Sequence, residues 1–242
     1  MKVAVIGAGG VGGYFGARLA QAGHDVTFVA RGRHLAAIRE HGLAIESALG
    51  DATVRCPATD DLSALGPVDV AMLCVKLWDV EATAPKLAGI VSNGGVVIPF
   101  QNGVESADRV AALLGPSHVL GGVAYIAATI RAPGVIAHTG TMARLRVGAF
   151  PGGPEDRAAA FADACRSAGV EIEHTPDIRR ALWEKFVFLA SFSGITSAAR
   201  SPIGVVRSDP DLRALLEAAM REVWSVGVAR GVALPDDFVA KQ

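Results

Sequence analysis

The sequence predicts an α/β domain built on a parallel sheet, followed by a smaller domain that consists only of helices. The first observation is an apolar run at residues 2–6 that leads directly into a glycine-rich turn and a helical segment. The second is the recurrence of strand-like apolar runs at 68–75 and 96–100, with helical spacing between them, which is typical of βαβ units. The last part of the chain shows only helical patterns. We therefore predict domains at 1–175 and 176–242.

The glycine-rich turn has the spacing of a dinucleotide-binding loop. In the motif G-x-G-x-x-G, Gly7 allows a tight turn, Gly9 lets the backbone approach a pyrophosphate, and Gly12 lets the helix pack closely on the strand. A second strand, expected at Asp25–Val29, follows the helix. The predicted phosphate-binding residues are Gly7, Ala8, Gly9, Gly10, Val11 and Gly12. We interpret the first domain as a Rossmann dinucleotide-binding domain, and the alternative is a glycine turn with a structural role only.

The residues after the second strand indicate which dinucleotide is bound. An NAD site needs a carboxylate there to accept hydrogen bonds from the ribose 2′-hydroxyl, but no Asp or Glu occurs between Val26 and Arg39. Arg31 and Arg33 take that place, and a guanidinium matches the charge and geometry of a 2′-phosphate. The sequence therefore favours NADP. The alternative is that these arginines only begin an exposed helix.

Two polar residues follow strands whose carboxyl ends are expected at one edge of the sheet. Lys76 ends the apolar run at 68–75, and Asn102 follows the run at 96–100, with Gly103 behind it. Ligands of open α/β sheets bind beyond these carboxyl ends, so both residues are candidate ligand contacts. The alternatives are a lysine that leaves the sheet into solvent and a simple Asn-Gly turn.

Between these motifs and the helical domain, the pattern changes to strands joined by turns. We expect strands at 119–130, 135–138 and 144–147 that extend the sheet in antiparallel fashion. A helix is expected through 86–90, before the strand that precedes Asn102. Short strands are also expected at 43–45 and 53–55, and nothing catalytic is evident there.

Composition and charge restrict the classes of partner. A net charge of -1 gives no basic field, so nucleic acid and anionic membranes are unfavourable partners and a small molecule is favoured. The longest apolar runs are too short to span a bilayer, and Met1 opens on a core strand rather than on a signal peptide, so a cytoplasmic protein is expected. The three cysteines and six histidines are scattered and predict neither a disulfide framework nor a metal site.

One lysine of the helical domain has a setting that suits proton transfer. Lys185 lies at the edge of an apolar helical run at 186–192, which is expected to be buried because it is apolar on all sides. Partial burial lowers the pKa of a lysine towards the range in which it gives up a proton near neutral pH. The alternative from the residues alone is an ordinary surface lysine.

Taken together, four motifs give the chain a specific likeness. With the glycine loop, Val75-Lys76, Gln101-Asn102-Gly103 and Leu182–Phe186 in this order, the chain resembles the ketopantoate reductases, also called 2-dehydropantoate 2-reductases, over essentially all 242 residues. The resemblance implies reduction of 2-dehydropantoate to pantoate by NADPH in pantothenate and coenzyme A biosynthesis. It implies a substrate in the cleft between the domains, and it allows a homodimer.

The resemblance also implies a role for particular residues. Arg31 is expected to contact the 2′-phosphate of NADP, and Lys76 to contact the cofactor. Asn102 is expected to bind nicotinamide and substrate, and the backbone of Ala128 to lie against the cofactor. Lys185 is expected to be the proton donor.

The chain departs from the family pattern at the expected substrate site. Leu189 and Ser193 stand four and eight residues after the lysine, where the family commonly carries substrate-binding asparagines. An aliphatic group and a hydroxyl cannot hold the same hydroxy acid in the same way, so a different 2-oxo or 2-hydroxy acid is the first alternative. A non-catalytic NADP-binding regulatory protein is the second. We also expect the natural chain to continue past Gln242, because the family has further helices there.

Overall fold

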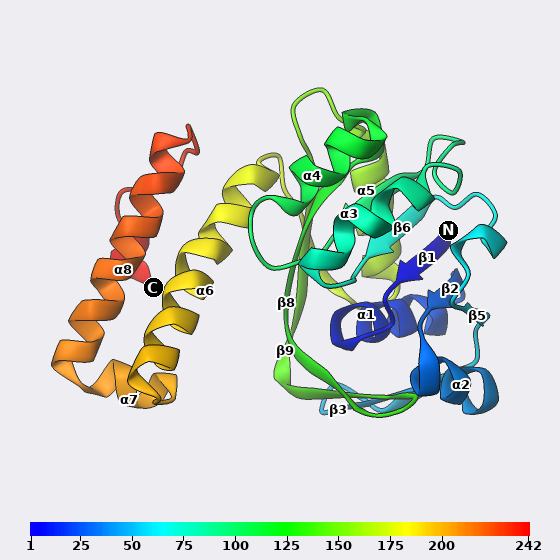
Figure 1. Ribbon diagram of the computed structural model, residues 1–242, viewed down its shortest axis with the longest axis horizontal. Coiled ribbons are helices and arrows are strands. Elements are labelled where there is room, and N and C mark those ends of the chain that lie inside the picture. Colours follow the sequence, from blue (N-terminus) through cyan, green and yellow to red (C-terminus); the bar gives the residue numbers. More distant parts are fainter. The chain divides into compact units, whose positions relative to one another are not determined.

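The computed structural model describes residues 1–242 and divides into two compact units (Figure 1). The first unit contains residues 1–101 and 105–178, and the second contains residues 102–104 and 179–242. The first unit therefore ends three residues after the domain boundary that we predict at 175, and the short segment around Asn102 belongs to the helical unit. None of the helices combines the length and apolar character needed to cross a membrane.

The first unit is organised around a parallel sheet of five strands in the order β5-β2-β1-β6-β7. These strands are β1 (Lys2–Ile6), β2 (Asp25–Val29), β5 (Ala58–Thr59), β6 (Val70–Leu73) and β7 (Val96–Pro99). The chain adds β2 and β5 on one side of β1 and then returns to place β6 and β7 on the other side. The strand order thus reverses at β1, and ligands of open α/β sheets bind at the carboxyl end of such a switch point.

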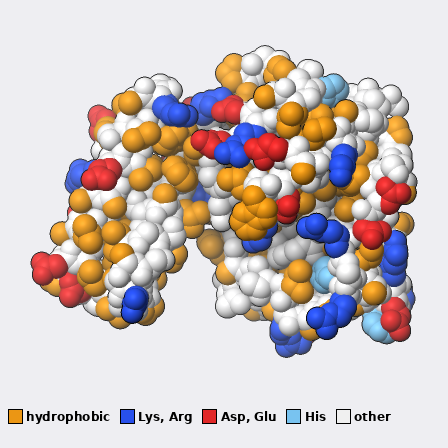
Figure 2. Space-filling model, in the orientation of Figure 1, with side chains coloured by type: hydrophobic (Ala, Val, Ile, Leu, Met, Phe, Trp, Pro, Cys, Tyr) orange, Lys and Arg blue, Asp and Glu red, His pale blue; other side chains and the backbone are white.

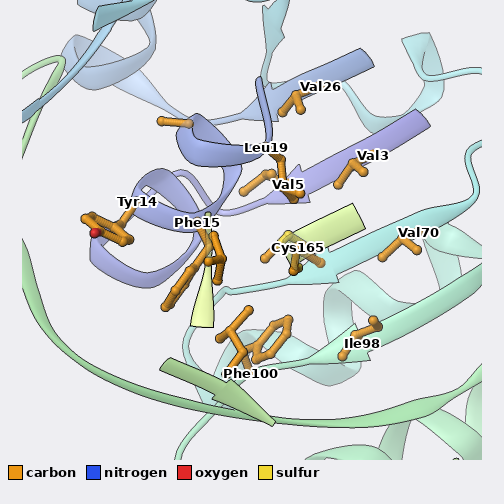
Figure 3. Close-up of a cluster of buried hydrophobic side chains, with 14 of the residues drawn as sticks. Val3, Val5, Tyr14, Phe15, Leu19, Val26, Val70, Ile98, Phe100 and Cys165 are labelled. Atoms are coloured by element: carbon orange, nitrogen blue, oxygen red, sulfur yellow. The ribbon is translucent and has the colours of Figure 1, made fainter. Parts of the chain in front are cut away.

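Both faces of this sheet are covered, which explains the continuous apolar character of its strands. Side chains alternate across β1: Val3 and Val5 belong to one buried cluster, and Ala4 and Ile6 belong to another. On the first face, the side chains of β1 pack with Phe15 of helix α1 (Gly10–Gln21) and with other strands of the sheet (Figure 3). The remaining helices of the unit are α2 (Gly32–His41), α3 (Val80–Thr83), α4 (Ser106–Leu114) and α5 (Glu155–Ser167).

The strands that we expected to extend this sheet form a second sheet instead. It has the order β10-β9-β3-β4, and β8 pairs with β9. Its strands are β3 (Leu43–Ser47), β4 (Ala52–Val54), β8 (Leu120–Ala132), β9 (Val135–Ala149) and β10 (Glu171–His174). One isolated parallel bridge, between Val97 and Val119, joins the two sheets. The prediction was wrong because the residues of β9 pair with β3 and β10 as well as with β8.

Two local expectations also differ from the structure. The runs at 135–138 and 144–147 belong to one strand, whose register shifts beside the residues between them. His138 links the two ends of this irregular segment, since its Nε2 lies within hydrogen-bonding distance, 3.0 Å, of the carbonyl oxygen of Met142. The helix expected through 86–90 is replaced by α3 and a 3-10 turn at Ala84–Leu87, and Pro85 has no N–H with which to continue α3.

The second unit is helical, as expected. It contains α6 (Ile178–Ala199), α7 (Ile203–Ser208), α8 (Pro210–Ala229) and α9 (Phe238–Lys241), and most of α6 belongs to it. Trp183 and Val187 of α6 pack against Leu216 and Met220 of α8 in its core. The apolar run at 186–192 is less buried than expected, because only two of its residues are fully buried.

Candidate functional site

The glycine loop connects β1 to α1 in a conformation that its glycines make accessible. Gly7 has a φ of +104°, which L side chains rarely adopt, and its amide donates a hydrogen bond to the carbonyl of Val29 at 3.1 Å. A Cβ at Gly12 would lie 2.3 Å from the carbonyl oxygen of Gly7 and 2.8 Å from Cγ1 of Val5. Gly7 and Gly12 are therefore required by the turn itself and by the close packing of α1 on β1.

The middle glycines of the loop have contrasting surroundings. A Cβ at Gly10 would lie 2.0 Å from the carbonyl oxygen of Ala128, so β8 crosses directly against the first turn of α1. A Cβ at Gly9 would have no heavy atom within 4 Å. Packing within the protein explains why residue 10 is a glycine, but it does not explain the glycine at position 9. Open space beside Gly9, at the amino end of a helix, is what a bound phosphate needs.

A cavity of about 480 Å³ opens beside this loop, within the first unit. It lies where β1, β2 and β6 end, which is the switch point of the parallel sheet. The predicted cofactor residues that line it are Gly7, Ala8, Gly9, Arg31 and Lys76. Those that do not line it are Gly10, Val11, Gly12, Ala128 and Asn102. The structure thus brings Arg31 and Lys76 to the same cavity as the glycine loop.

The cavity has both cationic and anionic side chains in its wall. Arg31 and Lys76 line it together with Lys86, and Asp60 and Asp79 line it as well. Arg31 Nη2 lies 3.9 Å from Oδ2 of Asp79, but 82% of the Arg31 side chain remains exposed. Arg31 can therefore still reach a phosphate. Charges of both signs are also mixed over the molecular face drawn in Figure 2, in agreement with the small net charge.

His34 is a residue of this cavity that the sequence reasoning missed. Its Nδ1 accepts a hydrogen bond from the amide of Gly134 at 3.0 Å, so the ring proton is assigned to Nε2. Nε2 then donates to the carbonyl oxygen of Ala8 at 2.8 Å. His34 therefore ties the glycine loop to the first turn of α2 and to the turn between β8 and β9. A single histidine at a helix start carries no local signal for such a role.

Gln101 belongs to one of the four motifs, but no role was predicted for it. Its Nε2 donates to the carbonyl oxygens of Leu73 and Val75, both at 2.9 Å. These bonds hold the end of β7 beside the end of β6. Gln101 is buried, and it fixes the backbone immediately before Asn102.

In the second unit, Lys185 and Asn102, the two residues predicted to be catalytic, are in contact. Lys185 Nζ donates a hydrogen bond to Asn102 Oδ1 at 2.8 Å. Lys185 is half-buried, and desolvation lowers its pKa to about 8. The ammonium group therefore remains the main form at neutral pH, yet it gives up its proton more readily than an ordinary lysine. Such a group can serve as a general acid.

The two residues that depart from the family pattern follow Lys185 on α6. Leu189 is half-buried, one turn after Lys185, and Ser193 is exposed one turn later. Side chains spaced by four residues share a helix face. The Ser193 hydroxyl donates to the carbonyl oxygen of Ala190 at 3.1 Å. The face that carries Lys185 thus continues with an aliphatic group and a hydroxyl that already has a partner.

Comparisons with known proteins identify the family to which the chain belongs. The family model described as "Ketopantoate reductase PanE/ApbA" matches residues 3–152, and "Ketopantoate reductase PanE/ApbA C terminal" matches residues 177–242. The chain is 30% identical to the 2-dehydropantoate 2-reductase of Mesorhizobium japonicum, over 97% of this chain and 78% of that relative.

Solved structures lead to the same group of proteins. The 2-dehydropantoate 2-reductase from Geobacter metallireducens matches with a TM-score of 0.92 and 30% identity, over 100% of this chain and 80% of that one. D-mandelate dehydrogenase, solved with NADH and anilino(oxo)acetate, matches with a TM-score of 0.89 but only 19% identity, over 100% of this chain and 78% of that one. This second likeness is one of fold.

Proposed function

The chain belongs to the ketopantoate reductase family of oxidoreductases, and from this premise we propose that it reduces 2-dehydropantoate to pantoate with NADPH. The product would serve pantothenate and coenzyme A biosynthesis. The observation that carries the proposal is the hydrogen bond from Lys185 Nζ to Asn102 Oδ1, because it places a lysine of lowered pKa beside an amide. A proton donor and a polar orienting group are what reduction of a carbonyl requires.

The residues of the first unit fit the cofactor. Gly9 leaves space for the pyrophosphate at the amino end of α1, and Arg31 offers a guanidinium to the 2′-phosphate. Lys76 adds a second positive charge to the same cavity. The hydrogen bond from His34 to Ala8 fixes the position of the glycine loop relative to the start of α2, where Arg31 lies. Ala128 supports this loop through its carbonyl group against Gly10.

The chemistry then divides between the cofactor and the protein. The chemistry that NADPH would supply when bound is a hydride for the C2 carbonyl carbon of the 2-oxo acid. Lys185 donates its proton to the carbonyl oxygen, and its positive charge stabilises negative charge that develops there. Asn102 orients Lys185 through its Oδ1, and its amide nitrogen can donate to a carbonyl of nicotinamide or substrate.

The experiment that tests the proposal is oxidation of NADPH in the presence of a panel of 2-oxo acids, followed by the loss of NADPH absorbance. We expect turnover that depends on the 2-oxo acid. NADPH binding without turnover on any member of the panel would instead identify a non-catalytic binding protein. The panel also ranks substrates, which decides between 2-dehydropantoate and other acids.

Leu189 and Ser193 favour a second candidate, an enzyme of the same family that reduces a 2-oxo acid with an apolar side chain. The matched probe is 3,3-dimethyl-2-oxobutanoate, which is 2-dehydropantoate without its hydroxyl group. We expect Leu189→Asn to raise the kcat/KM ratio of 2-dehydropantoate to this analogue by roughly two- to tenfold, the value of one hydrogen bond. Ala198→Asn, at an exposed position of α6 on the opposite side of the helix from Leu189, is the control. An unchanged ratio in Leu189→Asn removes Leu189 from the substrate site.

Arg31 is expected to determine the choice between NADPH and NADH. A charge-assisted bond to the 2′-phosphate is worth about 1.5–3 kcal/mol, so Arg31→Ala should reduce the preference for NADPH by roughly one to two decades. Dissociation constants of both cofactors measure this directly. The control is Arg33→Ala, since Arg33 is exposed and does not line the cavity. Equal binding of the two cofactors by the unmodified protein contradicts the prediction.

A further inference from the structure

The chain contains only two asparagines, Asn93 and Asn102, and each is followed by glycine. In an Asn-Gly sequence, the backbone nitrogen of the glycine can attack the side-chain amide carbon of the asparagine. Glycine favours this reaction because no Cβ blocks the approach and because its backbone is mobile. Asparagine is accordingly a thermolabile residue, which loses its side-chain amide group on heating or long storage.

The structure around Asn102 leaves this path open. Asn102 is exposed and lies in an irregular segment between β7 and α4. The backbone of Gly103 has a φ of +108°, with no heavy atom within 4 Å of the Cβ position. The amide of Gly103 donates no hydrogen bond to another backbone group. The attacking nitrogen is therefore not held by a competing bond.

Lys185 activates the group that is attacked. Its Nζ donates to Asn102 Oδ1 at 2.8 Å, which draws electron density from the side-chain amide carbon. The same bond stabilises the oxyanion that forms when the glycine nitrogen adds to that carbon. Asn93 lies in an exposed turn, and no lysine donates a hydrogen bond to its side chain. The deamidation rate of Asn93 is therefore the reference for that of Asn102.

We propose that Asn102 is a site of spontaneous deamidation and that its conversion inactivates the enzyme. The nitrogen of Gly103 forms a bond to Cγ of Asn102 and loses its proton to water, while Nδ2 takes up a proton from water, the Cγ–Nδ2 bond breaks and ammonia leaves. Water then opens the resulting succinimide at either carbonyl, which yields aspartate or isoaspartate. The net change is hydrolysis of one amide to a carboxylate and ammonia, with no oxidant or reductant.

The loss of activity follows from the position of the new carboxylate and rests on the proposed function. A negative charge beside the ammonium group of Lys185 favours its protonated form and so raises its pKa, opposing the effect of burial. The carboxylate also has no N–H with which to orient a carbonyl group. The proton donor therefore becomes a weaker acid, and the orienting donor is lost.

Incubation of the native protein in mildly alkaline buffer tests the proposal. One tryptic peptide, residues 87–109, carries both asparagines, so fragmentation of that peptide reads both sites in the same sample. We expect Asn102 to convert no more slowly than Asn93, and activity to fall in proportion to the Asn102 that is lost. The Asn93→Ser protein is expected to lose activity on the same course. Conversion of Asn93 while Asn102 stays intact overturns the proposal.

Two further results separate this proposal from the proposed function. The mass change at Asn102 is read without any activity, so it decides the modification even in a chain that never oxidises NADPH. Conversion of Asn102 with full retention of activity overturns the inactivation, and it also removes Asn102 from catalysis. The Asn102→Asp protein is expected to turn over about tenfold more slowly, near the upper value of one hydrogen bond because the amide N–H donor is lost, with its alkaline loss of rate moved to higher pH.

Discussion

Lys185→Ala is expected to lower kcat by at least about a hundredfold, because a positioned proton donor contributes on that scale. The dissociation constant of NADPH should change little, since the cavity beside the glycine loop belongs to the first unit and Lys185 to the second. Steady-state kinetics with the best 2-oxo acid measure the first quantity, and titration with NADPH measures the second. Lys241→Ala, which removes an exposed lysine of the same unit, is the matched control.

The pH dependence of kcat provides a separate test of the same role. Burial lowers the pKa of Lys185 to about 8, and only the protonated lysine can donate. The rate is therefore expected to be highest below that value and to fall as the pH rises through about 8. A Lys185→Ala protein with normal turnover, or a native rate that increases through this range, contradicts the assigned role.

Gly9→Ala is expected to weaken NADPH binding while leaving the free protein as stable as before. The added Cβ has no protein atom within 4 Å, and the φ of Gly9 is -79°, which alanine accepts readily. The same methyl group would crowd a pyrophosphate bound at the amino end of α1. Crowding of a closely packed contact costs about 1–3 kcal/mol, which corresponds to roughly 5- to 150-fold in affinity.

Gly10→Ala is the contrasting variant for this experiment. Its Cβ would lie 2.0 Å from the carbonyl oxygen of Ala128, so the free protein itself should lose at least about 1–3 kcal/mol of unfolding free energy. Denaturant titrations of both variants, together with NADPH titrations, separate packing from binding. If Gly9→Ala binds NADPH as tightly as the native protein, the glycine at this position does not face the pyrophosphate.

Much of the first unit could be predicted because its signals are local. The strands Lys2–Ile6 and Asp25–Val29 have the predicted bounds, since each is a short apolar run that ends at a glycine or a polar turn. The glycine loop was recognisable because three functions of glycine occur at a fixed spacing. The helical character of the last part of the chain followed from its spacing of apolar residues.

The second sheet could not be predicted from the same kind of pattern. The sequence predicts strands at 119–130, 135–138 and 144–147, but alternation of side chains does not determine which strands pair with one another. In the structure, β9 pairs in parallel with β3, which lies about ninety residues earlier in the chain, and with β10. Pairing between such distant strands depends on how both sheets and their helices pack together, so it cannot be predicted from the sequence of any one segment.

The sequence alone determined the family, the order of the domains, and the individual residues Arg31, Lys76, Asn102 and Lys185 as candidates. Only the tertiary structure decided which of them meet. It placed Lys185 Nζ 2.8 Å from an amide 83 residues earlier in the chain, and it joined His34 to a backbone amide 100 residues later. Hydrogen bonds have strict limits of distance and angle, so they form only after packing has set the positions of distant segments.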